Sequence, residues 1–136
     1  MVLKKGGIES DTADLTTIRV NTVVEKIQFD VKEVTVKAGK KIKLILVNPD
    51  FMPHNLVIVK PGTADSVANA AIALGADGFK KQFLPDDPNI LQATKLLDKG
   101  ETQEIAFTAP ATAGDYPFIC TFPGHATIMR GVMHVK

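Results

Sequence analysis

The most constraining feature of this sequence is a succession of short apolar runs with alternating side chains, separated by Gly, Pro and Asn. Ile42, Leu44 and Leu46, for example, alternate with Lys41 and Lys43. This period of two is typical of a strand with one face in a core. We therefore predict an all-β fold, a Greek-key β-sandwich of seven or eight strands. The apolar runs cover residues 18–31 (one bent strand or two), 34–38, 42–46, 54–59, 102–108, 115–120 and 130–136.

One stretch departs from this pattern. Residues 64–74 are rich in alanine and have apolar positions at helical spacing, and Gly75 follows as a helix stop. We predict that residues 62–97 form a short helical flap and connection across the sandwich. A length of 136 residues favours a single domain over 1–136, with residues 1–15 as a frayed lead-in.

Charge and cysteine content exclude several classes of protein. Sixteen basic and fifteen acidic residues give a net charge of +1, which provides no electrostatic reason for binding nucleic acid or an anionic membrane. No apolar run approaches the twenty residues of a membrane span. Cys120 is the only cysteine, so an internal disulfide and a four-cysteine zinc site are excluded. Residues 1–7 contain two lysines and no apolar stretch, so they are not an intact secretory signal.

The chemically distinctive residues lie near the carboxyl end, within Cys120-Thr-Phe-Pro-Gly-His125-Ala-Thr-Ile-Met129. A thiol, an imidazole and a thioether thus occur within ten residues, around a Pro-Gly turn. Alternation places Cys120 on the same strand face as Phe118, where a core-facing row ends. His54 begins another apolar strand far upstream. The four donors are therefore expected to meet at one end of the sandwich.

This donor set narrows the choice of metal. Two His and one Cys with a weak axial Met are the donors of blue-copper sites. Zinc usually recruits a fourth strong donor, and attached haem needs a C-x-x-C-H sequence, which is absent. Copper is therefore the cofactor that fits best.

At these residues the sequence resembles a known family. Cys120–Met129 has the C-x4-H-x3-M spacing and the Thr-Phe-Pro-Gly filling of the copper loop of azurin. His54-Asn55 after an Asn-Pro turn and the Gly-Asp-Tyr-x-Phe-x-Cys approach, residues 114–120, are also similar, and the resemblance covers roughly residues 18–136. It implies an azurin-like or auracyanin-like cupredoxin, a type 1 blue copper protein.

The resemblance also implies roles for individual residues. His54, Cys120 and His125 would be the strong copper ligands, and Met129 the axial one.

Three further residues would support these ligands. Asn55 would steady the ligand loop, and the Phe122 N–H would donate to the Cys120 sulfur. Pro53 stands where azurin has a glycine, so its carbonyl is a candidate axial contact. Pro117 lies within the strand that leads to Cys120, where a proline suits an edge or a bulge.

The function expected from this site is one-electron transfer by Cu(I)/Cu(II), with a copper-delivery module as the alternative. An enzyme is not expected. Copper nitrite reductases and multicopper oxidases place His beside the blue-copper Cys, whereas Ile119 and Thr121 flank Cys120 here. The expected partners are redox proteins, such as a cytochrome, a reductase or an oxidase. The resemblance implies a periplasmic or otherwise exported location.

A docking patch is expected around the edge of His125. Between Cys120 and Met129 the loop contains no Asp, Glu, Lys or Arg. Exposed apolar surface of this kind commonly marks a contact site. The predicted patch consists of Met52, Pro123 and Ile128.

Overall fold

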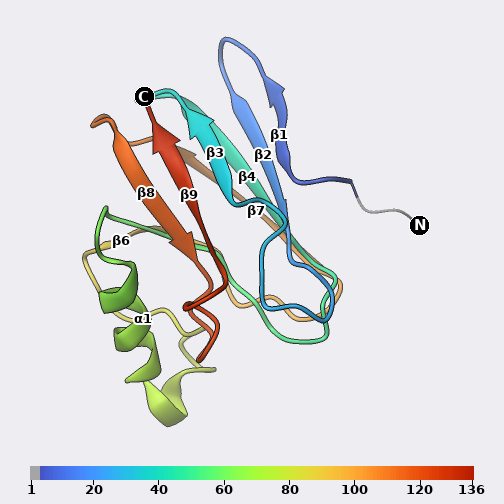
Figure 1. Ribbon diagram of the computed structural model, residues 1–136, viewed down its shortest axis with the longest axis vertical. Helices are drawn as coiled ribbons and strands as arrows, with labels where there is room; N and C mark the ends of the chain where they lie inside the picture. The colour runs from blue at the N-terminus through green and yellow to red at the C-terminus, as the bar shows by residue number, and fades with distance from the viewer. Residues whose placement is uncertain (1–3) are drawn as a thin grey trace.

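The computed structural model describes residues 4–136 and contains two β-sheets packed face to face (Figure 1). Short helical elements are confined to residues 64–77 in this part of the chain. The strands are β1 Gly7–Asp11, β2 Thr16–Asn21, β3 Glu33–Val36, β4 Lys41–Asn48, β5 Val57–Val59, β6 Ile90–Ala93, β7 Glu101–Thr108, β8 Gly114–Ile119 and β9 Arg130–Val135.

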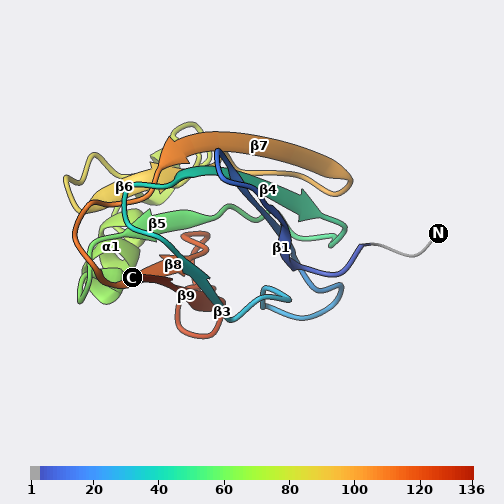
Figure 2. The same ribbon diagram turned by 90° about the horizontal axis from the view of Figure 1, so that it is seen from above.

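The two sheets have orders β1-β2-β4-β7 and β3-β9-β8-β5-β6. Most neighbours are antiparallel, but β2 pairs with β4 and β3 pairs with β9 in parallel. Figure 2, seen from above, shows β4 and β7 in one layer and β8 and β9 in the other. The all-β sandwich is confirmed, with nine strands in place of seven or eight.

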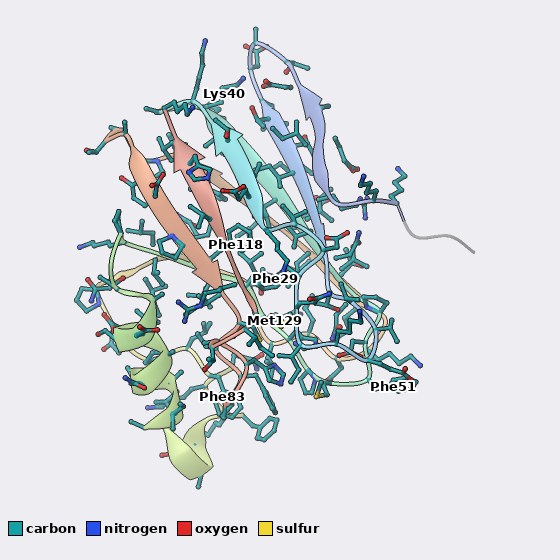
Figure 3. The ribbon with its side chains drawn as sticks, in the orientation of Figure 1. Phe29, Lys40, Phe51, Phe83, Phe118 and Met129 are labelled. Carbon is teal, nitrogen blue, oxygen red and sulfur yellow. The ribbon has the colours of Figure 1, made fainter. Side chains whose placement is uncertain are left out.

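The core lies between the sheets because each strand directs alternate apolar side chains inward. In β4, Ile42, Leu44 and Leu46 are buried, as their alternation with lysine predicts. The Phe29 and Phe118 rings meet in this core at 5.5 Å between centroids (Figure 3). The same core cluster includes Cys120 and Met129, so the predicted site grows directly out of the interior.

A helix covers the outer face of the second sheet. Helix α1, Ala64–Ile72, lies beside β8 in Figure 1 and packs Val67 against Val57 and Ile119 in a second apolar cluster. It ends two residues before the predicted Leu74, and a 3₁₀ turn over Gly75–Asp77 follows. Within residues 4–136, no helix has the length and apolar character needed to cross a bilayer.

The structure differs from several local predictions. The run 54–59 forms a strand only at Val57–Val59, and His54 makes an isolated bridge to Leu97 before it. Residues 7–11 of the predicted lead-in form β1, which pairs with β2, while residues 1–3 lie outside the described part. The connection 62–97 contains an additional strand, β6. The run 18–31 forms only β2, after which the chain makes a single bridge from Thr22 to Phe29.

Pro117 lies where β8 has a paired strand on one side only. Strand β8 pairs with β9 along its whole length, but it pairs with β5 only at Phe118 and Ile119. Pro117, which has no N–H to donate, lies just before this pairing begins. The strand thus carries a proline and still delivers Cys120 to the end of the sheet.

Candidate metal centre

Cys120 lies directly after β8, at the end of the row of inward-facing side chains that includes Phe118. It is completely buried and forms no disulfide. Its N–H donates to the Met129 carbonyl at 3.1 Å, so the two ends of the ligand loop are joined by a backbone hydrogen bond. The thiol therefore occupies a fixed position at the edge of the core.

His54 reaches the same point from the segment before β5, the strand that pairs with β8. Its N–H and carbonyl both bond to the backbone of Leu97, at 3.0 and 2.8 Å, which fixes the residue just before β5. Its side chain is completely buried, and its Nδ1 lies 3.8 Å from Cys120 Sγ. Two residues 66 positions apart in the sequence are thereby brought into contact.

His125 is supplied by the loop that follows Cys120. Gly124 has a φ of +85°, which a glycine adopts without strain, and this turn directs His125 back toward the thiol. Its Nδ1 lies 3.6 Å from Cys120 Sγ, and its carbonyl accepts the N–H of Met129 at 2.7 Å. The loop is thus closed on itself by hydrogen bonds.

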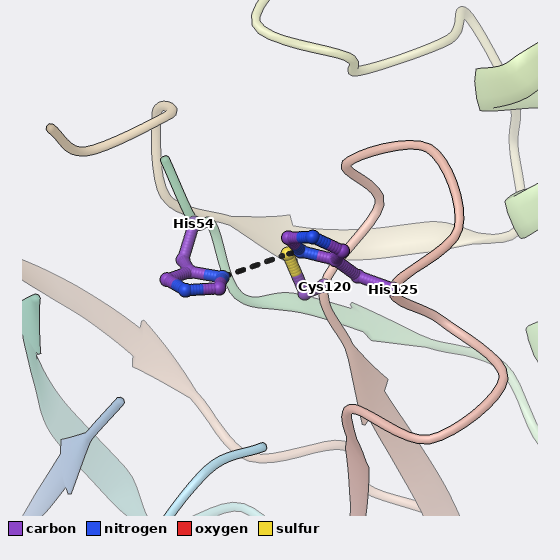
Figure 4. A group of neighbouring side chains, drawn as sticks. All are labelled: His54, Cys120 and His125. Carbon is purple, nitrogen blue, oxygen red and sulfur yellow. Dashed lines mark hydrogen bonds between the residues drawn. The ribbon is translucent and has the colours of Figure 1, made fainter. Parts of the chain in front are cut away.

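The three donors form one compact group. One ligand atom each from His54, Cys120 and His125 lies within 4.8 Å of the other two. Figure 4 shows both imidazole rings directed toward the sulfur from different segments of the chain. Across residues 4–136, no other three His, Cys, Asp or Glu side chains gather in this way.

Met129, the predicted axial residue, is also completely buried and belongs to the main core. Figure 3 places it toward the same end of the molecule as Phe83 and Phe51, opposite Lys40. Pro53, half-buried, directly precedes His54. The axial roles of the Met129 thioether and of the Pro53 carbonyl stay predictions.

Burial sets the protonation of the donors. It lowers the pKa of His125 to about 4 and also lowers the pKa of His54, so both imidazoles are neutral near pH 7. Burial raises the pKa of the Cys120 thiol to about 11, although hydrogen bonds from the backbone N–H groups of Asn55 and Phe122 oppose the rise. Neutral imidazoles have free lone pairs for a metal, and a coordinating thiol loses its proton to one.

A carboxylate that the sequence analysis missed lies against His54. Asp50 Oδ2 is 2.8 Å from His54 Nε2, and both side chains are buried. Burial raises the pKa of Asp50, but hydrogen bonds from His54 and from the N–H groups of Glu25 and Phe51 outweigh it, so the pKa lies below its ordinary value. The Asn-Pro-Asp sequence indicated a turn there but not the partner of its carboxylate.

Asn55 connects three segments around the site. Its Oδ1 accepts the Thr121 N–H at 2.8 Å, and its Nδ2 donates to Thr121 Oγ1 at 2.8 Å and to the Gln82 carbonyl at 3.2 Å. Thr121 Oγ1 donates in turn to the Phe83 carbonyl at 2.7 Å. The residue after Cys120 is thereby tied both to the segment before β5 and to the flap.

Aromatic rings continue outward from His125. The Phe122 ring lies 4.7 Å from the His125 ring, and it contacts Phe83 at 5.3 Å and Phe79 at 5.8 Å between centroids. Phe79 is 61% exposed, so this cluster runs from a buried imidazole to the surface. Phe79 and Phe83 come from the flap, and the sequence analysis did not assign them to the site.

The predicted docking residues lie near this end of the molecule. Ile128 is 60% exposed, Pro123 is exposed and Met52 is half-buried. Phe51 is also exposed, and the Lys99 ammonium lies 3.7 Å from its ring centroid. The apolar surface is thus broader than the sequence indicated.

The chemistry of this donor set fits copper. A thiol and two neutral imidazoles converge in a buried site, and a buried Met occurs in the same loop. Thiolate and thioether donors favour Cu(I), and imidazole suits both copper states. No carboxylate belongs to the donor group, as a site for a hard oxygen-binding cation would require.

Comparison with known proteins leads to the same metal. Residues 16–136 match the family of copper binding proteins of the plastocyanin/azurin type. Auracyanin-A of Chloroflexus aurantiacus is 38% identical over 124 residues, 88% of this chain and 74% of the relative. Azurin-1 of Alcaligenes xylosoxydans xylosoxydans is 34% identical over 114 residues, 78% of this chain and 87% of the relative.

A solved structure agrees with these relatives. Dithionite-reduced auracyanin of Roseiflexus castenholzii superposes with a TM-score of 0.81 at 38% identity, over 93% of this chain and 99% of that one. These relatives are azurins and auracyanins and none is named as an enzyme, in agreement with the prediction that this protein is not one. The chain belongs to the plastocyanin/azurin family of copper-binding proteins, as a cupredoxin whose cofactor is a single copper ion.

Proposed function

We propose that the protein is a type 1 copper electron carrier, with His54, Cys120, His125 and Met129 as the ligands. Bound copper would alternate between Cu(II) and Cu(I) and so take up and release one electron. The observation that carries this proposal is the convergence of three buried donor atoms within 4.8 Å of one another. Ligands already held in place rearrange little between two oxidation states.

The chain supplies this rigidity through hydrogen bonds. The Cys120 N–H to Met129 carbonyl bond and the Met129 N–H to His125 carbonyl bond lock the loop, and the Leu97 backbone holds His54. Backbone N–H groups of Asn55 and Phe122 bond to Cys120, where they support negative charge on the sulfur. Burial of all three side chains limits the access of water to the donors.

A copper-delivery module is the alternative. Delivery requires donors that a partner can reach and exchange. Here His54 and Cys120 are completely buried and His125 is 4% exposed. This burial supports a carrier that retains its metal.

We further propose redox proteins as partners and the apolar rim of Met52, Pro123 and Ile128 as their contact. Electron-transfer encounters are small and transient, and an uncharged rim suits them. An exported location is proposed from the resemblance to azurins and auracyanins alone.

The test is addition of Cu(II) to the copper-free protein, followed by its visible spectrum. We expect an intense thiolate-to-copper band that disappears on reduction by ascorbate and returns on oxidation. Cys120→Ser should lack the band, while Thr127→Ser, on the exposed side of the loop, should keep it. A wild-type protein without the band would refute the type 1 site. Rapid loss of copper to a mild chelator would favour delivery.

A further inference from the structure

Asp50 is a buried carboxylate beside the donor group, and the electron-carrier proposal does not use it. Its residue is 1% exposed. Oδ2 accepts a hydrogen bond from His54 Nε2 at 2.8 Å, and Oδ1 accepts the Glu25 N–H at 2.9 Å. The Asp50 N–H donates to Asn48 Oδ1 at 3.0 Å, so the backbone that carries the carboxylate is fixed as well.

No fixed cation neutralises this carboxylate. Among residues 4–136, His54 is its only partner within ion-pair distance. The Lys99 ammonium lies over the ring of Phe51, the residue next to Asp50, at 3.7 Å from its centroid. A negative charge with no paired Lys or Arg acts at close range on whatever His54 binds, and low polarity around it preserves that effect.

The hydrogen bond also selects one form of the imidazole. A carboxylate oxygen can only accept, so Nε2 must carry the proton. In a neutral ring, Nδ1 is then the unprotonated nitrogen, and Nδ1 is the atom that faces Cys120 Sγ at 3.8 Å. Carboxylate partners of this kind orient metal-binding histidines and raise their basicity.

We propose that Asp50 is a positioning residue for His54 and, through its charge, lowers the reduction potential of the copper site. The inference rests on the proposed role of His54 as a ligand. An electron from a one-electron reductant makes the site more negative by one charge, with no bond made or broken at Asp50. The carboxylate opposes this gain of charge and therefore favours the oxidised state.

The experiment compares the copper-loaded wild type with Asp50→Asn, which keeps the shape and a hydrogen-bond acceptor but removes the charge. At equilibrium with a one-electron mediator, we expect the Cu(I)/Cu(II) ratio of the variant to rise at least about tenfold, which corresponds to about 59 mV. The matched control is Asp98→Asn, which removes an exposed carboxylate. Solvent and salt screen such a charge, so its ratio should change less than about twofold.

A second measurement does not depend on copper. In the copper-free wild type, two-dimensional ¹⁵N spectra of the imidazoles should show His54 as the Nε2–H tautomer. In Asp50→Ala, the Nε2–H proton resonance should move upfield, because its hydrogen bond to a carboxylate is lost. A merely structural role for Asp50 would alter stability but neither this resonance nor the potential.

The outcomes separate this inference from the proposed function. A wild type that forms no thiolate-to-copper band overturns the function itself. A wild-type band together with an unchanged ratio in Asp50→Asn overturns the inference and leaves the function standing. If Asp50→Asn does not fold, the ¹⁵N spectrum of the copper-free wild type decides, because an Nδ1–H tautomer of His54 would also overturn the inference.

Discussion

Replacing Asn55 by alanine would remove two hydrogen bonds to the ligand loop and one to the flap. Two of them, each 2.8 Å, go to Thr121, and the third goes to the Gln82 carbonyl at 3.2 Å. Asn55 and Thr121 are buried, so water cannot replace the lost partners without opening the structure. The substitution therefore tests how the residue next to Cys120 is fixed.

The expected loss follows from the groups left without partners. An unsatisfied buried N–H on Thr121 costs about 1–3 kcal/mol, and each remaining hydrogen bond contributes about 1 kcal/mol. Thr121 Oγ1 keeps its bond to the Phe83 carbonyl, so its share of the loss is small. We expect Asn55→Ala to lower the free energy of unfolding by about 3 kcal/mol, a large part of an ordinary domain's stability.

The assay is urea denaturation of the copper-free protein, with unfolding free energies from linear extrapolation. The control is Asn69→Ala on the exposed side of α1, which should change stability by no more than about 0.5 kcal/mol. A loss below about 1 kcal/mol in Asn55→Ala would show that the Thr121 N–H finds another partner. The loop would then not depend on Asn55.

Two further predictions concern the surface. Ile128→Lys should leave the copper spectrum unchanged but slow electron self-exchange markedly at low salt, because like charges meet at the contact. The matched control is Ile8→Lys on β1, which should exchange electrons at the wild-type rate. If Ile128→Lys also exchanged electrons at the wild-type rate, this face would be excluded as the contact. His134 bonds to the Asp115 carboxylate at 2.6 Å and the Glu33 carboxylate at 3.1 Å, which raise its pKa above 6.5. The folded protein therefore binds this proton more tightly than the unfolded chain, so the stabilisation is complete below about pH 6.5 and is lost as the pH rises through the raised pKa. The difference in unfolding free energy between wild type and His134→Gln should thus be larger at pH 5.5 than at pH 9, and a difference independent of pH would contradict the ion pairs.

The central strands could be predicted from the sequence because burial on one face imposes alternation. Strand β4 shows this clearly. Strand β1 escaped prediction because four of its five residues are exposed, so its pairing with β2 does not depend on an apolar pattern. Strand β6 is half-buried throughout and shows no alternation either. Such strands are determined by their neighbours in the sheet.

The donors could likewise be identified because Cys120, His125 and Met129 lie within one short loop. The groups around these donors could not be identified from the sequence. The contact between Asp50 and His54 depends on the conformation of the turn between them. The place of Phe83 in the aromatic cluster depends on a backbone with positive φ at Gln82 and Phe83, which neither residue type favours. Sequence patterns report burial and spacing, but not the path of an irregular loop.

The distribution of donors between one local loop and one distant residue has a consequence for how strongly copper can stabilise the fold. Three donors lie within residues 120–129 and stay close together in an unfolded chain, whereas His54 is 66 residues from Cys120 and joins them only when β5 pairs with β8. A metal stabilises the native state only by the excess of its native affinity over its affinity for the denatured ensemble. Binding to the isolated loop therefore offsets part of the native affinity. The gain in melting temperature on loading measures chiefly what His54 and the fixed geometry add, not the whole free energy of binding.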